Sequence, residues 1–148
     1  MSDDTEMTAT AVAEVMSHPV YAVSGDVTLV QALGGMIATG RRHLAVVDAE
    51  GRCLGVVGDR AVAAAWADDP AVLEYRRVRQ LLDARPSVVG EDATIGDVAR
   101  RMYTDAVDAV AVIDRRGCPI GMVTGEDLIA LMARTIPAPP IARAPAKP

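Results

Sequence analysis

The sequence contains no phenylalanine, and aromatic side chains make up only 3% of its 148 residues. Its hydrophobic residues, 51% of the chain, are therefore mostly aliphatic. We expect a core in which small side chains pack closely, without the usual aromatic anchors. This apolar content excludes a chain that is disordered throughout, and the length is enough for one compact unit or two small halves.

Long apolar runs and an excess of basic residues are also missing. No stretch approaches the roughly 18 consecutive apolar residues of a membrane-spanning helix. Residues 1–10 are polar and acidic, unlike a signal peptide. The net charge of −5 disfavours nucleic acid as a partner, because phosphate contacts need a basic face. We therefore expect a cytoplasmic protein that binds neither membranes nor nucleic acid.

The sequence likewise lacks the motifs of catalytic and metal sites. Cys53 and Cys118 are too few for a disulfide framework, and neither lies in a C-x-x-C spacing. His18 and His43 have no partner at metal-ligand spacing. There is no glycine-rich phosphate loop, no G-x-S-x-G and no H-E-x-x-H. We expect no enzymatic activity, no catalytic residues and no metal site.

An internal repeat is present instead. With a shift of 66 residues, positions 26–62 align with positions 92–128 without a gap. The identical positions are Asp26, Thr28, Met36, Ala45, Val46, Asp48, Gly51, Gly55 and Val57 of the first copy. The repeat predicts two units that share one fold.

Each copy predicts the order β-α-β-β-α. An extended run follows a proline, and Thr28 or Thr94 then begins a helix with a capping box. Two aliphatic strands and a second helix come next. The expected strands are Val20–Val23, Leu44–Val47 and Leu54–Val57, and then Ser87–Val89, Val110–Ile113 and Ile120–Val123. The second helices are expected to begin near Asp59 and Glu126, and a connecting helix is expected over Ala71–Leu82.

The order of short patterns resembles a known family. The first copy has V-x-x-V-M-x-x-P, then D-x-T-L-x-x-A, a strand ending V-V-D, and G-x-x-x-G-V-V. This arrangement, from Val12 to Met132, is similar to the cystathionine β-synthase (CBS) domain, and the tandem resembles the pair called a Bateman module. The implied fold class is α/β, with two pseudo-symmetric β-α-β-β-α repeats packed as one module. The expected divisions are an N-terminal tail at 1–11, a first CBS domain at 12–66, a linker helix at 67–77, a second CBS domain at 78–134 and a proline-rich tail at 135–148.

The resemblance implies a regulatory site for an adenosine-containing ligand, such as AMP, ATP or S-adenosylmethionine, and no required cofactor. In the family motif, a hydroxyl and helical N–H groups face phosphate, and an Asp accepts the ribose hydroxyls. The second copy matches with Thr124 and Asp127, whereas the first has Gly58 and Ala61 at these positions. One competent site per chain is therefore expected. The resemblance places adenine near Ser87, Val88 and Val89 and near the strand containing Ala111 and Ile113.

Simpler interpretations of the same residues stay open. Thr124 and Asp127 also fit a plain helix cap. Arg60, Arg41 and Arg42 are candidates for reaching a phosphate, but solvated arginines on helix ends are the commoner case, because single exposed charges are the norm. Glu126 would repel a polyphosphate, which favours AMP, adenosine or a sulfonium ligand.

Three hypotheses for function follow. The first is a sensor that forms a homodimer through its helices and acts on a separate, unidentified protein. The second is a dimerisation scaffold that binds no ligand. The third is redox sensing through Cys53 and Cys118.

Overall fold

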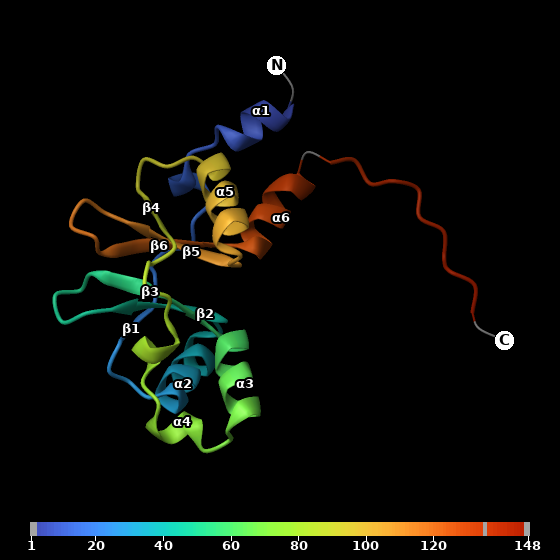
Figure 1. The fold of residues 1–148 in the computed structure, drawn as a ribbon. Coiled ribbons are helices and arrows are strands. Elements are labelled where there is room, and N and C mark those ends of the chain that lie inside the picture. The colour runs from blue at the N-terminus through green and yellow to red at the C-terminus, as the bar shows by residue number, and fades with distance from the viewer. Residues whose placement is uncertain (1–2, 135, 147–148) are drawn as a thin grey trace.

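The computed structural model describes residues 3–134 and 136–146 (Figure 1). Residues 1–2, 135 and 147–148, within the two predicted tails, lie outside the described residues. The predicted β-α-β-β-α order is confirmed in both repeats. The first repeat consists of β1 (Ala22–Ser24), α2 (Leu29–Thr39), β2 (His43–Val47), β3 (Cys53–Gly58) and α3 (Asp59–Asp68). The second consists of β4 (Val88–Gly90), α5 (Ile95–Asp105), β5 (Ala109–Ile113), β6 (Pro119–Thr124) and α6 (Gly125–Ala133).

Capping boxes begin the first helix of each repeat, as predicted. The Gln31 backbone N–H donates to Thr28 Oγ1 at 3.3 Å, and Gln31 Oε1 accepts from the Thr28 backbone at 2.9 Å. Thr94 and Asp97 repeat this exchange at 3.2 and 2.9 Å. These bonds satisfy N–H groups that a helix start otherwise leaves unpaired.

Each repeat contains one three-stranded sheet. In the first sheet, β1 is parallel to β2, and β2 is antiparallel to β3. The second sheet has the same order, with β4 parallel to β5 and β5 antiparallel to β6. The central strands are therefore β2 and β5, which accounts for their unbroken aliphatic sequences.

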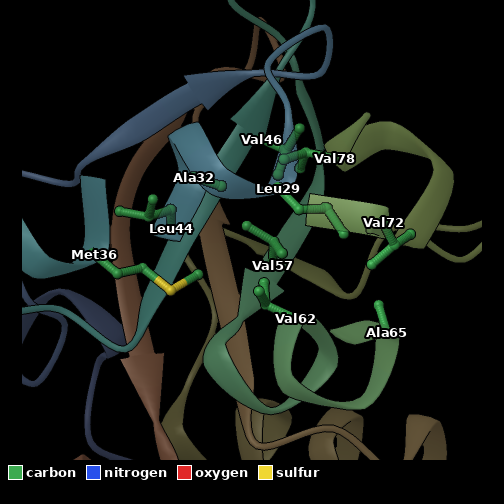
Figure 2. Packing of buried hydrophobic residues seen from close by; sticks show 10 residues of the cluster. All are labelled: Leu29, Ala32, Met36, Leu44, Val46, Val57, Val62, Ala65, Val72 and Val78. Atoms are coloured by element: carbon green, nitrogen blue, oxygen red, sulfur yellow. The ribbon is translucent and has the colours of Figure 1, made fainter. Parts of the chain in front are cut away.

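The core is aliphatic, as the composition predicts, and it forms one cluster per repeat with a smaller one between the sheets. Figure 2 shows the first cluster, in which side chains from α2, α3, β2 and β3 meet. The cluster between the sheets is built on Ala45, Ala109 and Met122. Alanine on both central strands lets the two sheets approach closely.

Each core is completed by a segment that precedes the other repeat in the sequence. The short 3-10 helix η1 (Val12–Glu14) buries Val12 in the second cluster, and the Val12 N–H donates to the Ala93 carbonyl at 2.9 Å. Its counterpart η2 (Val78–Leu81) buries Val78 in the first cluster, with a matching bond to the Val27 carbonyl at 2.9 Å. The two repeats therefore share chain segments and form one structural unit.

The expected connecting helix over residues 71–82 is wrong in one respect. The structure has two short helices, α4 (Val72–Tyr75) and η2, separated by Arg76 and Arg77 in extended conformation. The reason is tertiary pairing, since the Leu29 N–H donates to the Arg76 carbonyl at 3.1 Å and Arg77 bridges to Thr28.

The two ends of the chain differ in structure. Near the N-terminus, α1 (Asp3–Thr8) lies beside α5. After α6, residues 136–146 are exposed and extended and project away from the body in Figure 1.

Candidate functional site

Two cavities lie where the repeats meet. The first, which we call the Thr124 cavity, has a volume of about 400 Å³ and includes Thr124, Asp127, Tyr21 and Arg41 in its lining. The second, the Gly58 cavity, has a volume of about 720 Å³ and includes Gly58, Ala61, Ser87 and Tyr103. Each cavity contains the end of the last strand of one repeat, where the following helix begins.

Thr124 and Asp127 form the start of α6 in the Thr124 cavity. The Thr124 backbone N–H donates to Asp127 Oδ2 at 2.8 Å, and the Thr124 hydroxyl donates to the same oxygen at 3.2 Å. Within the described residues, Asp127 Oδ1 has no hydrogen-bond partner. The capping interaction therefore exists and still leaves one carboxylate oxygen able to accept a bond from a ligand hydroxyl.

Three arginines and one histidine supply positive or titratable groups to this cavity. Arg42 already has two acidic partners, because its Nε donates to Asp59 Oδ2 at 2.8 Å and its Nη1 lies 3.9 Å from Glu126. The hydrogen bond from Arg42 lowers the pKa of Asp59 below its ordinary value. The guanidinium of Arg41 lies 5.8 Å from the centre of the Tyr21 ring.

Arg60 is exposed and belongs to both cavities. Neither Arg41 nor Arg60 forms an ion pair with any residue that the structure describes. Both guanidinium groups are therefore available to an anion.

His43 and Asp108 form part of the lining of both cavities. His43 Nε2 lies 3.1 Å from Asp108 Oδ1, which joins β2 of the first repeat to the loop before β5 of the second. The Asp108 carbonyl also accepts the Gly125 N–H at 2.9 Å, so Asp108 contacts the start of α6 as well.

The Gly58 cavity differs from the Thr124 cavity at the positions of its motif. A Cβ at Gly58 would lie 3.0 Å from His43 Cδ2 and 3.2 Å from its Nε2. The imidazole thus takes the space in which the second repeat has a threonine side chain. Ala61 stands where Asp127 stands in the other repeat, so this position offers no carboxylate to a ribose.

The structure brings only some of the predicted site residues together. Thr124, Asp127 and Arg60 share the Thr124 cavity, whereas Ser87 lines the Gly58 cavity. Val88 and Val89 line a shallow hollow on β4 instead, at the opposite edge of the sheet from β6. In the central strand, Ala111 is fully buried, and Ile113 pairs with Pro119 at the far end from Thr124.

The separation arises because the segment that precedes the first strand of the first repeat lies against the second repeat. Ser17 pairs with Met122 through backbone bonds of 2.8 and 3.2 Å, which places the segment before β1 beside β6. Pro19, Val20 and Tyr21 therefore line the Thr124 cavity. None of these three residues was predicted for the site. The repeat offered a signal for them, because Pro19 aligns with Pro86 and so with the segment leading to Ser87.

The two cysteines lie at the same end of the molecule. The Cys53 N–H donates to the carbonyl of Gly117, the residue before Cys118, at 2.8 Å. Both thiols are free and half-buried. Burial raises the pKa of Cys53, which disfavours the reactive thiolate.

In the described part of the chain, no three His, Cys, Asp or Glu side chains gather in a way that would suit a metal ion. No helix in the same part of the chain has both the length and the apolar character needed to cross a membrane.

Comparisons with known proteins agree with this architecture. A CBS domain-containing protein of Dictyostelium discoideum is 29% identical over 140 residues, which cover 87% of this chain and 96% of that protein. A homoserine O-acetyltransferase of Methanohalophilus mahii is 28% identical over 123 residues, but the chain spans only 24% of its length.

Solved structures show the same fold. The CBS domain pair of protein MJ0100, in complex with 5′-methylthioadenosine and S-adenosyl-L-methionine, has a TM-score of 0.77 at 23% identity, covering 86% of this chain and 99% of that one. The structure of CBSX2 in complex with AMP has a TM-score of 0.70 at 21% identity, covering 85% and 98%. The sequence profile of the CBS domain matches residues 12–68 and again residues 78–134. The chain therefore belongs to the CBS domain family, with two copies in tandem.

Proposed function

We propose that this protein is a non-catalytic regulatory module that binds one adenosine-containing ligand per chain in the Thr124 cavity and acts on a separate protein. The observation that carries the proposal is Asp127, whose Oδ2 caps α6 while Oδ1 is left for a ligand. A carboxylate oxygen at a helix N-terminus can accept ribose hydroxyls, and the helix N–H groups there favour an anionic substituent. The adenosine ligands bound by MJ0100 and CBSX2 support this ligand class.

We infer one bound ligand per chain because the two cavities differ at the positions of the motif. The Gly58 cavity has Ala61 at the position of the ribose acceptor, and the His43 ring fills the space next to Gly58. We therefore infer that an adenosine ligand occupies the Thr124 cavity alone. Tyr21 and Pro19, which come from the first repeat, would contact it together with residues of the second. A ligand held by both repeats can alter their relative orientation, provided that it binds one orientation more tightly.

Ligand titration tests the proposal. Adenosine, AMP, ATP and S-adenosylmethionine are titrated against the full chain by calorimetry, and the melting temperature is followed in parallel. Binding to the folded state must raise the melting temperature. We expect one site per chain for at least one of these compounds. If none binds, the proposal is wrong and the ligand-free scaffold takes its place.

Substitution of Asp127 locates the site. Asp127→Ala should weaken binding about ten- to a hundredfold, since hydrogen bonds to a charged group contribute about 1.5–3 kcal/mol. The matched control is Asp97→Ala, which removes the same capping carboxylate from α5, outside the Thr124 cavity. Both variants lose a cap, but only Asp127→Ala should lose affinity. Equal affinity in Asp127→Ala and the wild type would reject this site.

The alternative of a dimerisation scaffold has a specific observation in its favour. Large apolar side chains are exposed on helices of both repeats, among them Ile37 of α2, Trp66 of α3, Tyr103 of α5 and Ile129 of α6. Exposed apolar side chains that gather into one patch are typical of a surface that another protein covers. We propose that two copies associate through these helices, and this association is compatible with either function.

A further inference from the structure

We propose that Cys53 and Cys118 are a redox pair, and that oxidation by a peroxide closes a disulfide bond between the two repeats. Both thiols are free and half-buried. Cys53 is the first residue of β3, and Cys118 directly precedes β6, whereas the two cavities lie where these strands end. The pair is therefore at the other end of the strands, and its oxidation does not depend on ligand binding.

A backbone hydrogen bond holds the two cysteines close together. The Cys53 N–H donates to the Gly117 carbonyl oxygen at 2.8 Å. The Cys53 Cα is one bond from the donor nitrogen, and the Cys118 Cα belongs to the same peptide unit as the accepting oxygen. Standard bond lengths then limit the distance between the two Cα atoms to about 7 Å at most, and any bend in the hydrogen bond shortens it. Disulfides join Cα atoms about 4.4–6.8 Å apart, so the bond can form with little movement of the backbone.

The surroundings of the two side chains leave room for the bond. Figure 1 shows the β2–β3 and β5–β6 turns on the same side of the molecule. These turns contain Gly51 and Gly117, whose φ angles of 82° and 85° suit glycine. A Cβ at Gly51 would lie 3.9 Å from Cys118 Sγ, so this thiol faces the turn that leads into Cys53. Cys53 Sγ donates to the Gly55 carbonyl at 3.4 Å, a weak bond that rotation about χ1 can exchange for the link to Cys118.

The reaction consumes one hydrogen peroxide. Burial raises the pKa of Cys53, so this thiol is the poorer nucleophile, and we assign the first step to Cys118. The Cys118 sulfur attacks a peroxide oxygen, the O–O bond breaks, and a sulfenic acid and water form. The Cys53 sulfur then attacks the sulfenic sulfur, the S–O bond breaks, and a second water leaves. The two thiols together lose two protons and two electrons, which reduce the peroxide to two waters.

The disulfide would tie the first repeat to the second and close a loop of about 65 residues. A cross-link that closes a long loop restricts the unfolded chain strongly. Because the folded backbone already holds the pair together, the oxidised protein should be more stable than the reduced protein.

Peptide mapping of the full chain tests the proposal. The reduced protein is treated with one equivalent of hydrogen peroxide, its remaining thiols are alkylated, and it is digested with trypsin. Cleavage after arginine releases residues 53–60 and 117–134 as separate peptides. In the wild type, we expect these two peptides to be linked, and dithiothreitol should separate them. The melting temperature should rise by at least about 5 °C on oxidation.

Cys53→Ser and Cys118→Ser are the matched controls, and peroxide should raise the melting temperature of neither. Cys53→Ser should accumulate a sulfenic acid at Cys118 that dimedone traps, and Cys118→Ser should react more slowly. Faster trapping at Cys53 would overturn the order of the two steps.

Three results in the wild type would overturn the pair itself. They are two thiols that stay reduced, oxidation that stops at sulfinic acid, and disulfides that join only separate chains. An oxidised protein that melts no higher than the reduced one would contradict a bond that fits the native fold. These measurements involve no adenosine compound, so their failure would leave the proposed function untouched.

Discussion

His43 of the first repeat and Asp108 of the second are joined across the molecule, with His43 Nε2 3.1 Å from Asp108 Oδ1. The His43 side chain is 14% exposed and that of Asp108 is 62% exposed, so the contact is only partly open to solvent. Because both residues line both cavities, this bond lies between the two places where a ligand could bind.

The His43–Asp108 contact should contribute measurably to stability. A double-mutant cycle with His43→Ala and Asp108→Ala should give a coupling energy of about 0.5–1.5 kcal/mol in urea unfolding. The exposed Arg42–Glu126 pair, at 3.9 Å, provides the comparison and should couple by less than about 0.5 kcal/mol. A His43–Asp108 coupling no larger than that of Arg42–Glu126 would show that the contact does not hold the repeats together.

Gly121→Ala should destabilise the fold. A Cβ at Gly121 would come within 2.8 Å of Met16 Cγ and 3.1 Å of Met16 Cβ, so the Met16 side chain would have to move. We expect a loss of about 1–3 kcal/mol in the free energy of unfolding. The loss should be smaller in a Met16→Ala background, which removes most of the overlap.

Gly34→Ala is the matched control for that substitution. Gly34 lies within α2, and a Cβ there would meet nothing within 4 Å. Replacing it should stabilise the helix by about 0.5–1 kcal/mol, because alanine is the better helix former. Similar effects of the two substitutions would mean that the contact with Met16 is not tight.

The ion pair between Asp59 and Arg42 should make stability depend on pH in acid. The hydrogen bond from Arg42 lowers the pKa of Asp59 in the folded protein. The resulting stabilisation is fully present above the unfolded-state pKa of about 3.9, and it is lost as the pH falls through the lower folded-state pKa.

Melting temperatures of the wild type and Asp59→Asn, measured between neutral pH and strong acid, check this dependence. The wild type should melt higher at neutral pH, and the difference should shrink below about pH 4. In an Arg42→Gln background, Asp59→Asn should have little effect at any pH. A difference that persists unchanged into strong acid would contradict the role of the charge.

A charged residue on α6 should prevent self-association. Ile129 is 63% exposed on this helix, and Ile129→Asp would place a carboxylate in the proposed helical interface. We expect the wild type to sediment as a dimer and Ile129→Asp to sediment as a monomer. Ile141→Asp, which alters an exposed isoleucine in the extended C-terminal segment, should leave the dimer intact. A wild type that stays monomeric at every concentration would exclude the interface.

Much of the fold could be predicted because its signals are local. Thr28 and Thr94 begin helices through bonds to residues three positions later, and those bonds depend on little beyond their own turn. The aliphatic runs of β2 and β5 identify buried central strands in the same way. The start of α6 at Thr124, together with its capping carboxylate, could also be predicted from the motif.

The composition of the site could not be predicted in this way. The placement of adenine near Ser87–Val89, in the same site as Thr124, came from the family resemblance. In the structure, Ser17 pairs with Met122, and Leu82 would contact a Cβ at Gly55, so each repeat receives the entering segment of the other. The break at Arg76 and Arg77 has the same origin, because backbone pairing with α2 overrides the helical tendency of the linker.

The sequence alone therefore determined the repeat, the secondary structure and the asymmetry between Thr124 with Asp127 and Gly58 with Ala61, since residue identities and short-range bonds carry all three. Only the tertiary structure decided which residues face Thr124, and it brought Tyr21, Arg41 and Arg60 there from the first repeat. Backbone pairing between segments about a hundred residues apart, such as Ser17 with Met122, depends on the packing of the two sheets. No local pattern in either segment specifies that pairing.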